Sequence, residues 1–343
     1  MKKNGICLGL VLLGSFMILH SMTPLGCEAA SGADKPVKLT MISAYTKDHV
    51  WNKYLFKWME KVAENSKGRI TIQWRGGPEV ISPFQNLAPV SKGSFDFVSN
   101  TPAFYPTIMP EGTGMQLCFA SPMEHRKLGT LQILDKVYRT KMNLTLLGWP
   151  FHGQGFGMLT FPPVKTLADL KGLKCRVVPQ WVPVAKALGM APVTLSIPET
   201  YSALEKKIAN AVLFVLDPTL FENGWYEHLK YVIRPNLYYV TSDFIHMNVD
   251  SWNRLSKKDQ GILVDSIKNL EPEIYDFFIQ LTEKEIQRAL SLGLKTVEFS
   301  KADAQEYVRL QFQTQWKEFE ASAPDTAAKL KTILPVPKEL MPK

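Results

Sequence analysis

The sequence predicts an α/β fold built from two units, and three observations support this prediction. Short segments of alternating apolar residues are followed by segments with apolar residues at helical spacing, and this succession restarts near residue 144. Of the 343 residues, 45% are hydrophobic, which is enough to fill ordinary globular cores. A single core is near its size limit at this length, so two domains are expected.

Residues 1–30 are interpreted as an export signal that precedes the fold. Lys2 and Lys3 come before an apolar stretch centred on residues 6–19, and the small residues Ala29 and Ala30 follow. We therefore expect a protein that acts outside the cytoplasm, in the periplasm.

Two alternatives remain open for this segment. Leu25-Gly26-Cys27 approximates a lipoprotein box, in which Cys27 would carry a lipid and anchor the protein to a membrane. The apolar run is also long enough to span a bilayer as an uncleaved anchor.

Elements of the first unit follow from the periodicity of its apolar residues. Alternation predicts strands over 37–42, 69–74 and 95–98, and helical spacing predicts helices over 48–66 and 84–92. Strands that alternate with helices in this way predict a parallel sheet covered by helices.

The second unit repeats the pattern. We expect strands over 144–148, 156–160, 173–178, 193–195 and 244–249, and helices over 181–188, from Pro198 onward, and over 251–270. A long amphipathic helix over 271–292, with Pro272 at its start, could run across both units.

Charge and cysteine content limit the possible partners. There are 40 Lys and Arg against 32 Asp and Glu, a net charge of +8, and the basic residues are scattered. This attracts anions but does not indicate nucleic-acid binding. Cys118 and Cys175 could form a disulfide in an oxidising compartment, although their apolar neighbours favour two buried free thiols.

Motifs for catalysis, cofactors and metals are missing from the sequence. It contains no GxSxG, HExxH or Walker loop, and the glycines at 153, 155 and 157 precede a predicted strand rather than a helix. We therefore predict a protein that is not an enzyme, with no cofactor and no metal. The histidines after residue 30 are isolated, without partners at ligand spacing: His49, His125, His152, His228 and His246.

Arg176 is the strongest functional candidate. It lies in an apolar strand between Cys175 and Val177, shortly before Pro179 ends that strand. Open α/β sheets bind ligands at the carboxyl ends of their strands. We expect the guanidinium to face solvent in a crevice and to hold a carboxylate through two parallel hydrogen bonds. The alternative is an internal salt bridge to an acidic side chain.

Around this arginine the sequence resembles the solute-binding proteins of tripartite ATP-independent periplasmic (TRAP) transporters, the DctP-type family. Residues 169–177 (DLKGLKCRV) match the family core DLKGLKxRV, 187–193 match ALGAxPV, and 198–204 match ExYxAL. Similarity also covers a GxxD turn at 93–96 and a PE step at 109–111, and it extends from about residue 37 to about 332.

The resemblance implies a two-domain periplasmic binding protein of the Venus-flytrap type, with parallel or mixed sheets, crossing strands and a long helix spanning both domains. Domain I is expected over 34–155 plus about 241–285, and domain II over 156–240 plus about 286–335. It also implies that Arg176 holds the carboxylate of a small organic acid. This acid would be delivered to the membrane permease subunits of an ion-gradient-driven transporter.

Two departures from the family pattern bear on the ligand. Residues 161–163 read Phe-Pro-Pro where many members have a second arginine, and 210–215 read NAVLFV where they have VDGxExP. An unpartnered buried polar group costs about 1–3 kcal/mol, so a monocarboxylate with an apolar or aromatic body is favoured over a dicarboxylate or sugar acid. Candidate ligand-binding residues besides Arg176 are Trp181, Phe214, Phe156, Tyr105, Trp149, Phe151 and Glu79, of which Glu79 would make a polar contact or cap a helix.

Two other functions fit the same sequence. One is an exported α/β enzyme that acts on a carboxylate substrate with His152 or Glu79 as base. The other is a binding protein that serves a signalling receptor instead of a permease.

Overall fold

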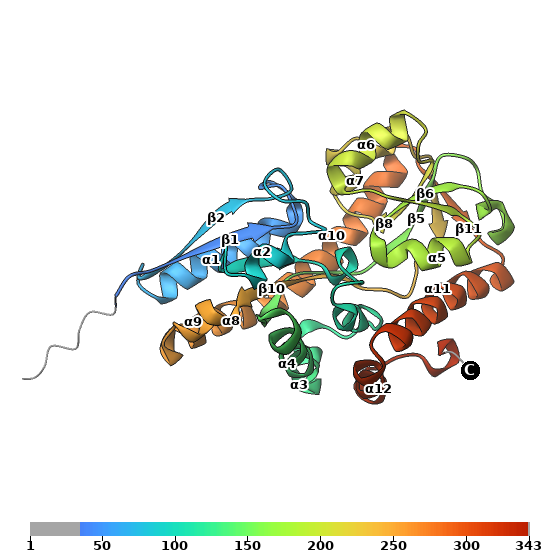
Figure 1. The fold of residues 1–343 in the computed structure, drawn as a ribbon. Helices are drawn as coiled ribbons and strands as arrows, with labels where there is room; N and C mark the ends of the chain where they lie inside the picture. The colour runs from blue at the N-terminus through green and yellow to red at the C-terminus, as the bar shows by residue number, and fades with distance from the viewer. Residues whose placement is uncertain (1–34, 342–343) are drawn as a thin grey trace, which may run out of the picture. The chain divides into compact units, whose positions relative to one another are not determined.

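The computed structural model describes residues 35–341, and the described residues from Pro36 onward form one compact unit. The predicted export signal and Cys27 lie outside the described residues. This unit contains two mixed β-sheets with helices packed around them (Figure 1). The division into two domains at the boundaries given above stays a prediction.

The first sheet has the strand order β2-β1-β3-β10-β4. Strand β1 pairs in parallel with β2 and β3, as the alternation of strands and helices predicts. Strand β10 pairs antiparallel with β3 and β4, so the sheet is mixed rather than parallel, because β10 enters it from a distant part of the chain. The strands are β1 Val37–Ser43, β2 Ile70–Gly76, β3 Phe97–Asn100, β4 Leu144–Gly153 and β10 Thr241–Asn248.

The second sheet has the strand order β11-β9-β5-β8-β6-β7. Strand β6 pairs in parallel with β7 and β8, whereas β5 pairs antiparallel with β8 and β9. The strands are β5 Phe156–Thr160, β6 Lys174–Val177, β7 Ala191–Thr194, β8 Ala211–Val215, β9 Tyr231–Arg234 and β11 Lys295–Glu298.

The chain passes between the sheets through short connections. Only Gln154 and Gly155 separate β4 from β5, and residues 235–240 return the chain from β9 to β10. Gly155 has φ +84°, which a residue with a side chain rarely adopts. These two connections correspond to the predicted crossing strands.

Helix α10, Glu271–Ser291, is the long helix that the sequence predicts. Near its start Glu271 accepts hydrogen bonds from Arg126, and near its end the Arg288 guanidinium lies 4.4 Å from the ring centroid of Phe221 in α7, Thr219–Glu222. The helix therefore runs from the first sheet to elements of the second, as Figure 1 also shows. Helices α1 to α7 and α10 are α1 Lys53–Asn65, α2 Leu87–Ser91, α3 Pro122–Leu128, α4 Thr130–Met142, α5 Val182–Ala187, α6 Ile197–Glu205, α7 Thr219–Glu222 and α10 Glu271–Ser291.

Some helical predictions need correction. The helix expected over 251–270 is two helices, because the side chain of Ser256 accepts the Asp259 N–H and starts a new helix. The stretch over 84–92 is helical only in α2. The remaining helices are α8 Val249–Asn253, α9 Lys257–Lys268, α11 Lys301–Ser322 and α12 Pro324–Ile333, with 3-10 turns at Val50–Asn52, Pro102–Phe104, Pro110–Gln116, Leu167–Leu170, Pro179–Trp181, Trp225–Glu227 and Lys338–Leu340.

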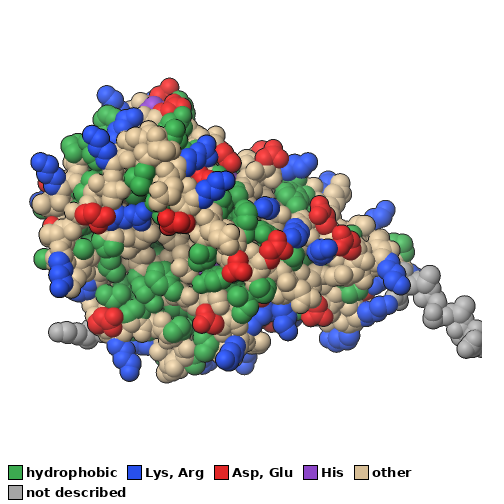
Figure 2. Space-filling view, turned by 180° about the vertical axis from the view of Figure 1, so that it is seen from behind, with side chains coloured by type: hydrophobic (Ala, Val, Ile, Leu, Met, Phe, Trp, Pro, Cys, Tyr) green, Lys and Arg blue, Asp and Glu red, His purple; other side chains and the backbone are tan. Residues whose placement is uncertain are grey.

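The surface and the cysteines agree with the composition. On the face shown in Figure 2, basic and acidic side chains are interspersed and form no large patch of one sign. Cys118 and Cys175 are buried and free, which confirms the expectation of two buried thiols. Between residues 35 and 341, no helix combines the length and apolar character that crossing a membrane requires.

Candidate functional site

Arg176 lies in strand β6, where it pairs with Val193 of β7 and Val212 of β8. The strand ends one residue later, as predicted from Pro179. The expectation that the guanidinium faces solvent is wrong, because Arg176 is 0% exposed. Phe214 and Trp225 lie against the guanidinium.

The guanidinium of Arg176 has no hydrogen-bond partner among the described residues. Its Nε, Nη1 and Nη2 atoms are all buried and unpaired. Its nearest ring neighbours are Phe214 and Trp225, whose centroids each lie 5.4 Å from Cζ. Glu199 exerts a favourable field on Arg176, but its carboxylate accepts the backbone N–H and hydroxyl of Ser196.

Burial without a partner has an electrostatic consequence for Arg176. Desolvation lowers its pKa from 12.5 to about 10, so the side chain is still a cation at neutral pH. A buried charge without a counter-ion costs several kcal/mol, and an anion that hydrogen-bonds to it offsets this cost. The internal salt bridge considered above is not present among the described residues.

A small cavity of about 20 Å³ lies beside Arg176. This space is enough for roughly one water molecule. It brings together four of the predicted ligand-binding residues, Arg176, Trp181, Phe214 and Phe156. The other lining residues are Trp51, Thr101, Ala103, Phe104, Val178, Leu213, Tyr239 and Thr241.

One wall of the cavity is a pair of stacked rings. Phe156 and Trp181 have centroids 4.2 Å apart and an interplanar angle of 11°. Tyr239 packs edge-on against both, and its hydroxyl lies 2.7 Å from Gln116 Oε1 and 3.0 Å from Gln180 Oε1. This part of the lining is therefore apolar, and Gln116 and Gln180 hold Tyr239 in place through its hydroxyl.

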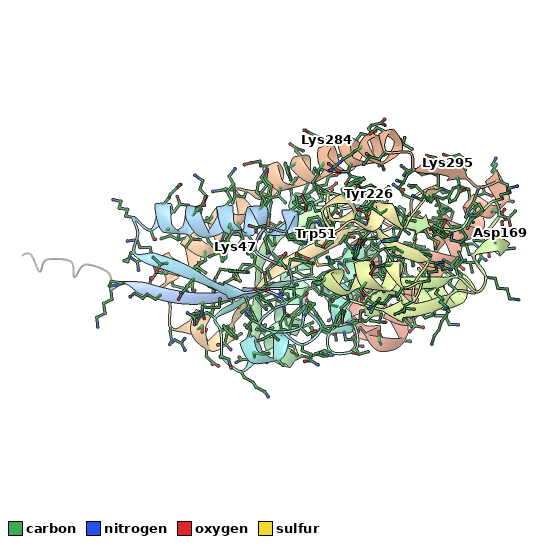
Figure 3. All side chains as sticks on the ribbon, turned by 90° about the horizontal axis from the view of Figure 1, so that it is seen from above. Lys47, Trp51, Asp169, Tyr226, Lys284 and Lys295 are labelled. Atoms are coloured by element: carbon green, nitrogen blue, oxygen red, sulfur yellow. The ribbon has the colours of Figure 1, made fainter. Side chains whose placement is uncertain are left out.

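Trp51 also lines the cavity. It lies in the 3-10 turn before α1, and Figure 3 shows it near the centre of the view. Its ring stacks on Phe151 at 4.2 Å and on Phe214 at 5.6 Å, with an interplanar angle of 12° in both cases. Because Trp51 shares its helical spacing with core residues, no local pattern indicates that it lines a site.

Two buried acids near Trp51 were also missed. Asp217 Oδ2 accepts the indole Nε1–H of Trp51 at 2.5 Å, and burial raises the pKa of Asp217 to about 7. Asp243 Oδ1 accepts the hydroxyl of Tyr45 at 2.9 Å, and burial raises the pKa of Asp243 to about 8. Single acids in apolar segments have no recognisable spacing, so only the structure shows them.

The structure does not bring Tyr105, Trp149 and Glu79 to this cavity. Tyr105 is in the core, with its hydroxyl 3.2 Å from that of Tyr138. Trp149 is buried against His125, whose ring is stacked at 5.6 Å. Glu79 is exposed and accepts the N–H of Gly77 at 2.7 Å, within its own turn.

His152, the base considered for an enzyme, is not part of this cavity either. It is buried, neither ring nitrogen has a partner, and burial lowers its pKa to about 3. Among residues 35–341 no group of three or more His, Cys, Asp or Glu is placed to hold a metal ion.

Known proteins share both the sequence pattern and the fold. Residues 42–322 match the family described as bacterial extracellular solute-binding protein, family 7, named DctP. A curated relative is the monocarboxylate 2-oxoacid-binding periplasmic protein of Nostoc sp. (strain PCC 7120). It is 25% identical over 282 residues, which are 78% of this chain and 74% of the relative.

Two solved structures illustrate the shared fold. A TRAP periplasmic solute-binding protein from Desulfovibrio salexigens with bound orotic acid has a TM-score of 0.76 and is 18% identical, covering 86% of this chain and 96% of its own. An extracytoplasmic solute receptor from Bordetella pertussis that binds pyroglutamic acid has a TM-score of 0.76 and is 17% identical, covering 87% and 99%.

The family match spans most of the described residues, and it confirms the predicted fold class and the resemblance. It also confirms the prediction of a binding protein rather than an enzyme, since the members of this family bind solutes without converting them. The chain belongs to family 7 of the bacterial extracellular solute-binding proteins, the DctP family of TRAP periplasmic solute-binding proteins.

Proposed function

We propose that this protein captures a small monocarboxylate with an apolar or aromatic body, and that Arg176 holds the carboxylate. The observation that carries the proposal is the fully buried guanidinium without an acidic partner. A carboxylate accepts two parallel hydrogen bonds from such a fork and neutralises its charge. Thus the ligand itself supplies the counter-ion that the protein lacks.

The lining of the cavity supports the choice of a monocarboxylate. Besides Arg176, the lining side chains are apolar or aromatic, apart from the hydroxyls of Thr101, Thr241 and Tyr239. A second carboxylate or a sugar ring would leave polar groups unpaired, at about 1–3 kcal/mol each. The name of the Nostoc relative, which specifies monocarboxylate 2-oxoacids, agrees with this class.

Capture requires the two sheets to separate, because the cavity of about 20 Å³ is too small for an organic acid to enter. The connections at Gln154–Gly155 and residues 235–240 are the places where the chain would bend. A ligand that contacts residues of both sheets favours the closed state by its difference in affinity for the two states.

The same proposal places the protein in the periplasm, after export directed by residues 1–30. There it delivers the acid to the membrane permease subunits of a TRAP transporter. The periplasmic proteins among its relatives support this location.

A thermal-shift series tests the ligand class. Pyruvate, 2-oxobutyrate and benzoate should raise the melting temperature, whereas succinate and glucuronate should not, because a ligand that binds only the folded state stabilises it by mass action. Arg139→Ala is the matched control for loss of the Arg176 side chain, since Arg139 pairs with Asp135 and does not line the cavity. The variant should respond to these acids as the wild type does. Stabilisation by succinate or glucuronate alone would contradict the proposal.

A further inference from the structure

The ring of Trp51 stacks on Phe214, which lines the cavity with it, and on Phe151, which lies outside the lining. Both neighbours of Trp51 are inclined to it by only 12°. Phe151 belongs to β4 of the first sheet, whereas Phe214 belongs to β8 of the second. The stacked rings therefore connect the first sheet with the second. The contact between the two sides is the one between Trp51 and Phe214.

In the closed arrangement, hydrogen bonds fix the plane of the Trp51 ring. Its indole N–H bonds to Asp217, and the other oxygen of Asp217 accepts the backbone N–H of Thr219 at 2.9 Å. Its backbone N–H donates to His49 Nδ1 at 3.2 Å, and His49 Nε2 lies 3.0 Å from the Thr219 hydroxyl. Closure of the sheets therefore sets the orientation of the Trp51 ring, which is then held at both its indole and its backbone.

Phe214 also connects the stack with Arg176. Its ring centroid lies 5.6 Å from that of Trp51 and 5.4 Å from the guanidinium carbon. A carboxylate on Arg176 therefore starts beside the face of Phe214. The atoms bonded to that carboxylate come next to the gap between the two parallel rings.

We propose that Trp51 and Phe214 form an aromatic clamp that selects acids with a flat, conjugated body, and that Trp51 is the specificity-determining residue. This inference rests on the proposed function of Arg176. A flat body fits between the rings once they stand about 7 Å apart, two contacts of about 3.5 Å each. Separation of the sheets supplies this extra distance, since Phe214 lies in the second sheet and Trp51 lies in the turn before α1, stacked on Phe151 of the first sheet. A puckered, saturated ring is thicker and cannot stack on both faces.

Benzoate and cyclohexanecarboxylate are the matched probes, because they share the carboxylate and ring size and differ in flatness. Calorimetry on the wild-type protein should give about tenfold tighter binding of benzoate, which corresponds to about 1.4 kcal/mol. In Trp51→Leu both acids should still bind, but with about the same affinity, so that the preference for benzoate is lost. In Trp51→Phe, which keeps an aromatic face, part of the preference should remain.

Trp58→Phe is the control, since Trp58 is buried away from the cavity and donates its indole N–H to the carbonyl of Leu263 at 3.0 Å. This variant should keep the full preference. Equal binding of the two acids by the wild type, or an unchanged preference in Trp51→Leu, overturns the clamp and leaves the role of Arg176 intact. If the folded wild type binds neither these acids nor any other monocarboxylate, the proposed function fails and the clamp fails with it.

Discussion

The indole Nε1–H of Trp51 donates to Asp217 Oδ2 across 2.5 Å, and the two residues are 166 positions apart in the chain. Trp51 precedes helix α1 beside the first sheet, whereas Asp217 follows strand β8 of the second. Both side chains are 2% exposed. This bond joins the two sheets next to the cavity, where Arg176 also lies, so it links the closed arrangement to the proposed binding site.

Breaking this bond should weaken the closed arrangement. Asp217→Asn keeps the shape of the side chain but presents a weaker acceptor to the indole, and Asp217→Ala removes the acceptor entirely. We expect Asp217→Ala to lower the free energy of unfolding by about 1–3 kcal/mol, because the buried indole N–H loses its partner. Urea unfolding followed by far-UV circular dichroism measures this change. A loss below 0.5 kcal/mol would mean that the bond contributes little.

Stability should depend on pH through Asp243. Burial raises the pKa of its carboxyl to about 8, above the value of an unfolded chain. The unfolded state therefore releases this proton first, and the contribution of Asp243 to stability falls as the pH rises from about 4 to about 8. Asp243→Asn removes this proton.

Urea unfolding of the wild type and Asp243→Asn at pH 5 and pH 8 checks this prediction. Relative to the wild type, Asp243→Asn should have a higher free energy of unfolding at pH 8 than at pH 5. All other titrating groups are common to both proteins, so their contributions cancel in this comparison. A difference that is the same at the two pH values would show that Asp243 does not titrate in this interval.

The ion pair at the start of α10 should be costly to break. Arg126 Nε donates to Glu271 Oε2 at 2.5 Å and its Nη2 to Oε1 at 2.6 Å, and Glu271 is 0% exposed. Arg126→Ala leaves a buried carboxylate without its partner, which costs about 3–5 kcal/mol. Thermal unfolding compares this variant with Lys61→Ala, whose exposed pair with Glu64 should matter little. Equal melting temperatures for the two variants would refute the prediction.

The two buried thiols should resist alkylation in the native protein. Desolvation raises the pKa values of both Cys118 and Cys175 to about 12, so almost no thiolate forms at pH 8. Iodoacetamide treatment followed by peptide mass spectrometry should find both unmodified until urea unfolds the chain. Modification of either cysteine at native pH 8 would show that its site opens.

Several elements could be predicted from the sequence because their signals are local. The apolar run around Arg176 and the nearby Pro179 define β6 and its end, and the spacing of Ile274 and Phe278 defines one face of α10. The motif at 169–177 identified the family. Such features depend on residues close in the chain, so they do not need tertiary information.

The rest of the site depends on contacts that no local pattern encodes. Trp51 falls within the helix predicted over 48–66, whereas its partners Phe151, Phe214 and Asp217 all come from distant segments. Sequence reasoning misses the burial of Arg176 for the same reason, because Phe214 and Trp225, which lie against it, are distant in the chain. Strand β10 is antiparallel to β3 and β4 because residues 235–240 lead the chain into the first sheet from the second. The periodicity of apolar residues predicts a strand but not the direction in which it runs in the sheet.

The central claim is that Arg176 binds the carboxylate of the ligand. Calorimetric titration of Arg176→Ala and Arg176→Lys tests this claim most directly. With pyruvate and benzoate as titrants, the account predicts clear binding by the wild type and at least about a hundredfold weaker binding by Arg176→Ala, since a charged hydrogen-bonded pair is lost. Arg176→Lys should also bind weakly, because a lysine lacks the planar fork. Wild-type affinity in a correctly folded Arg176→Ala protein would contradict the account.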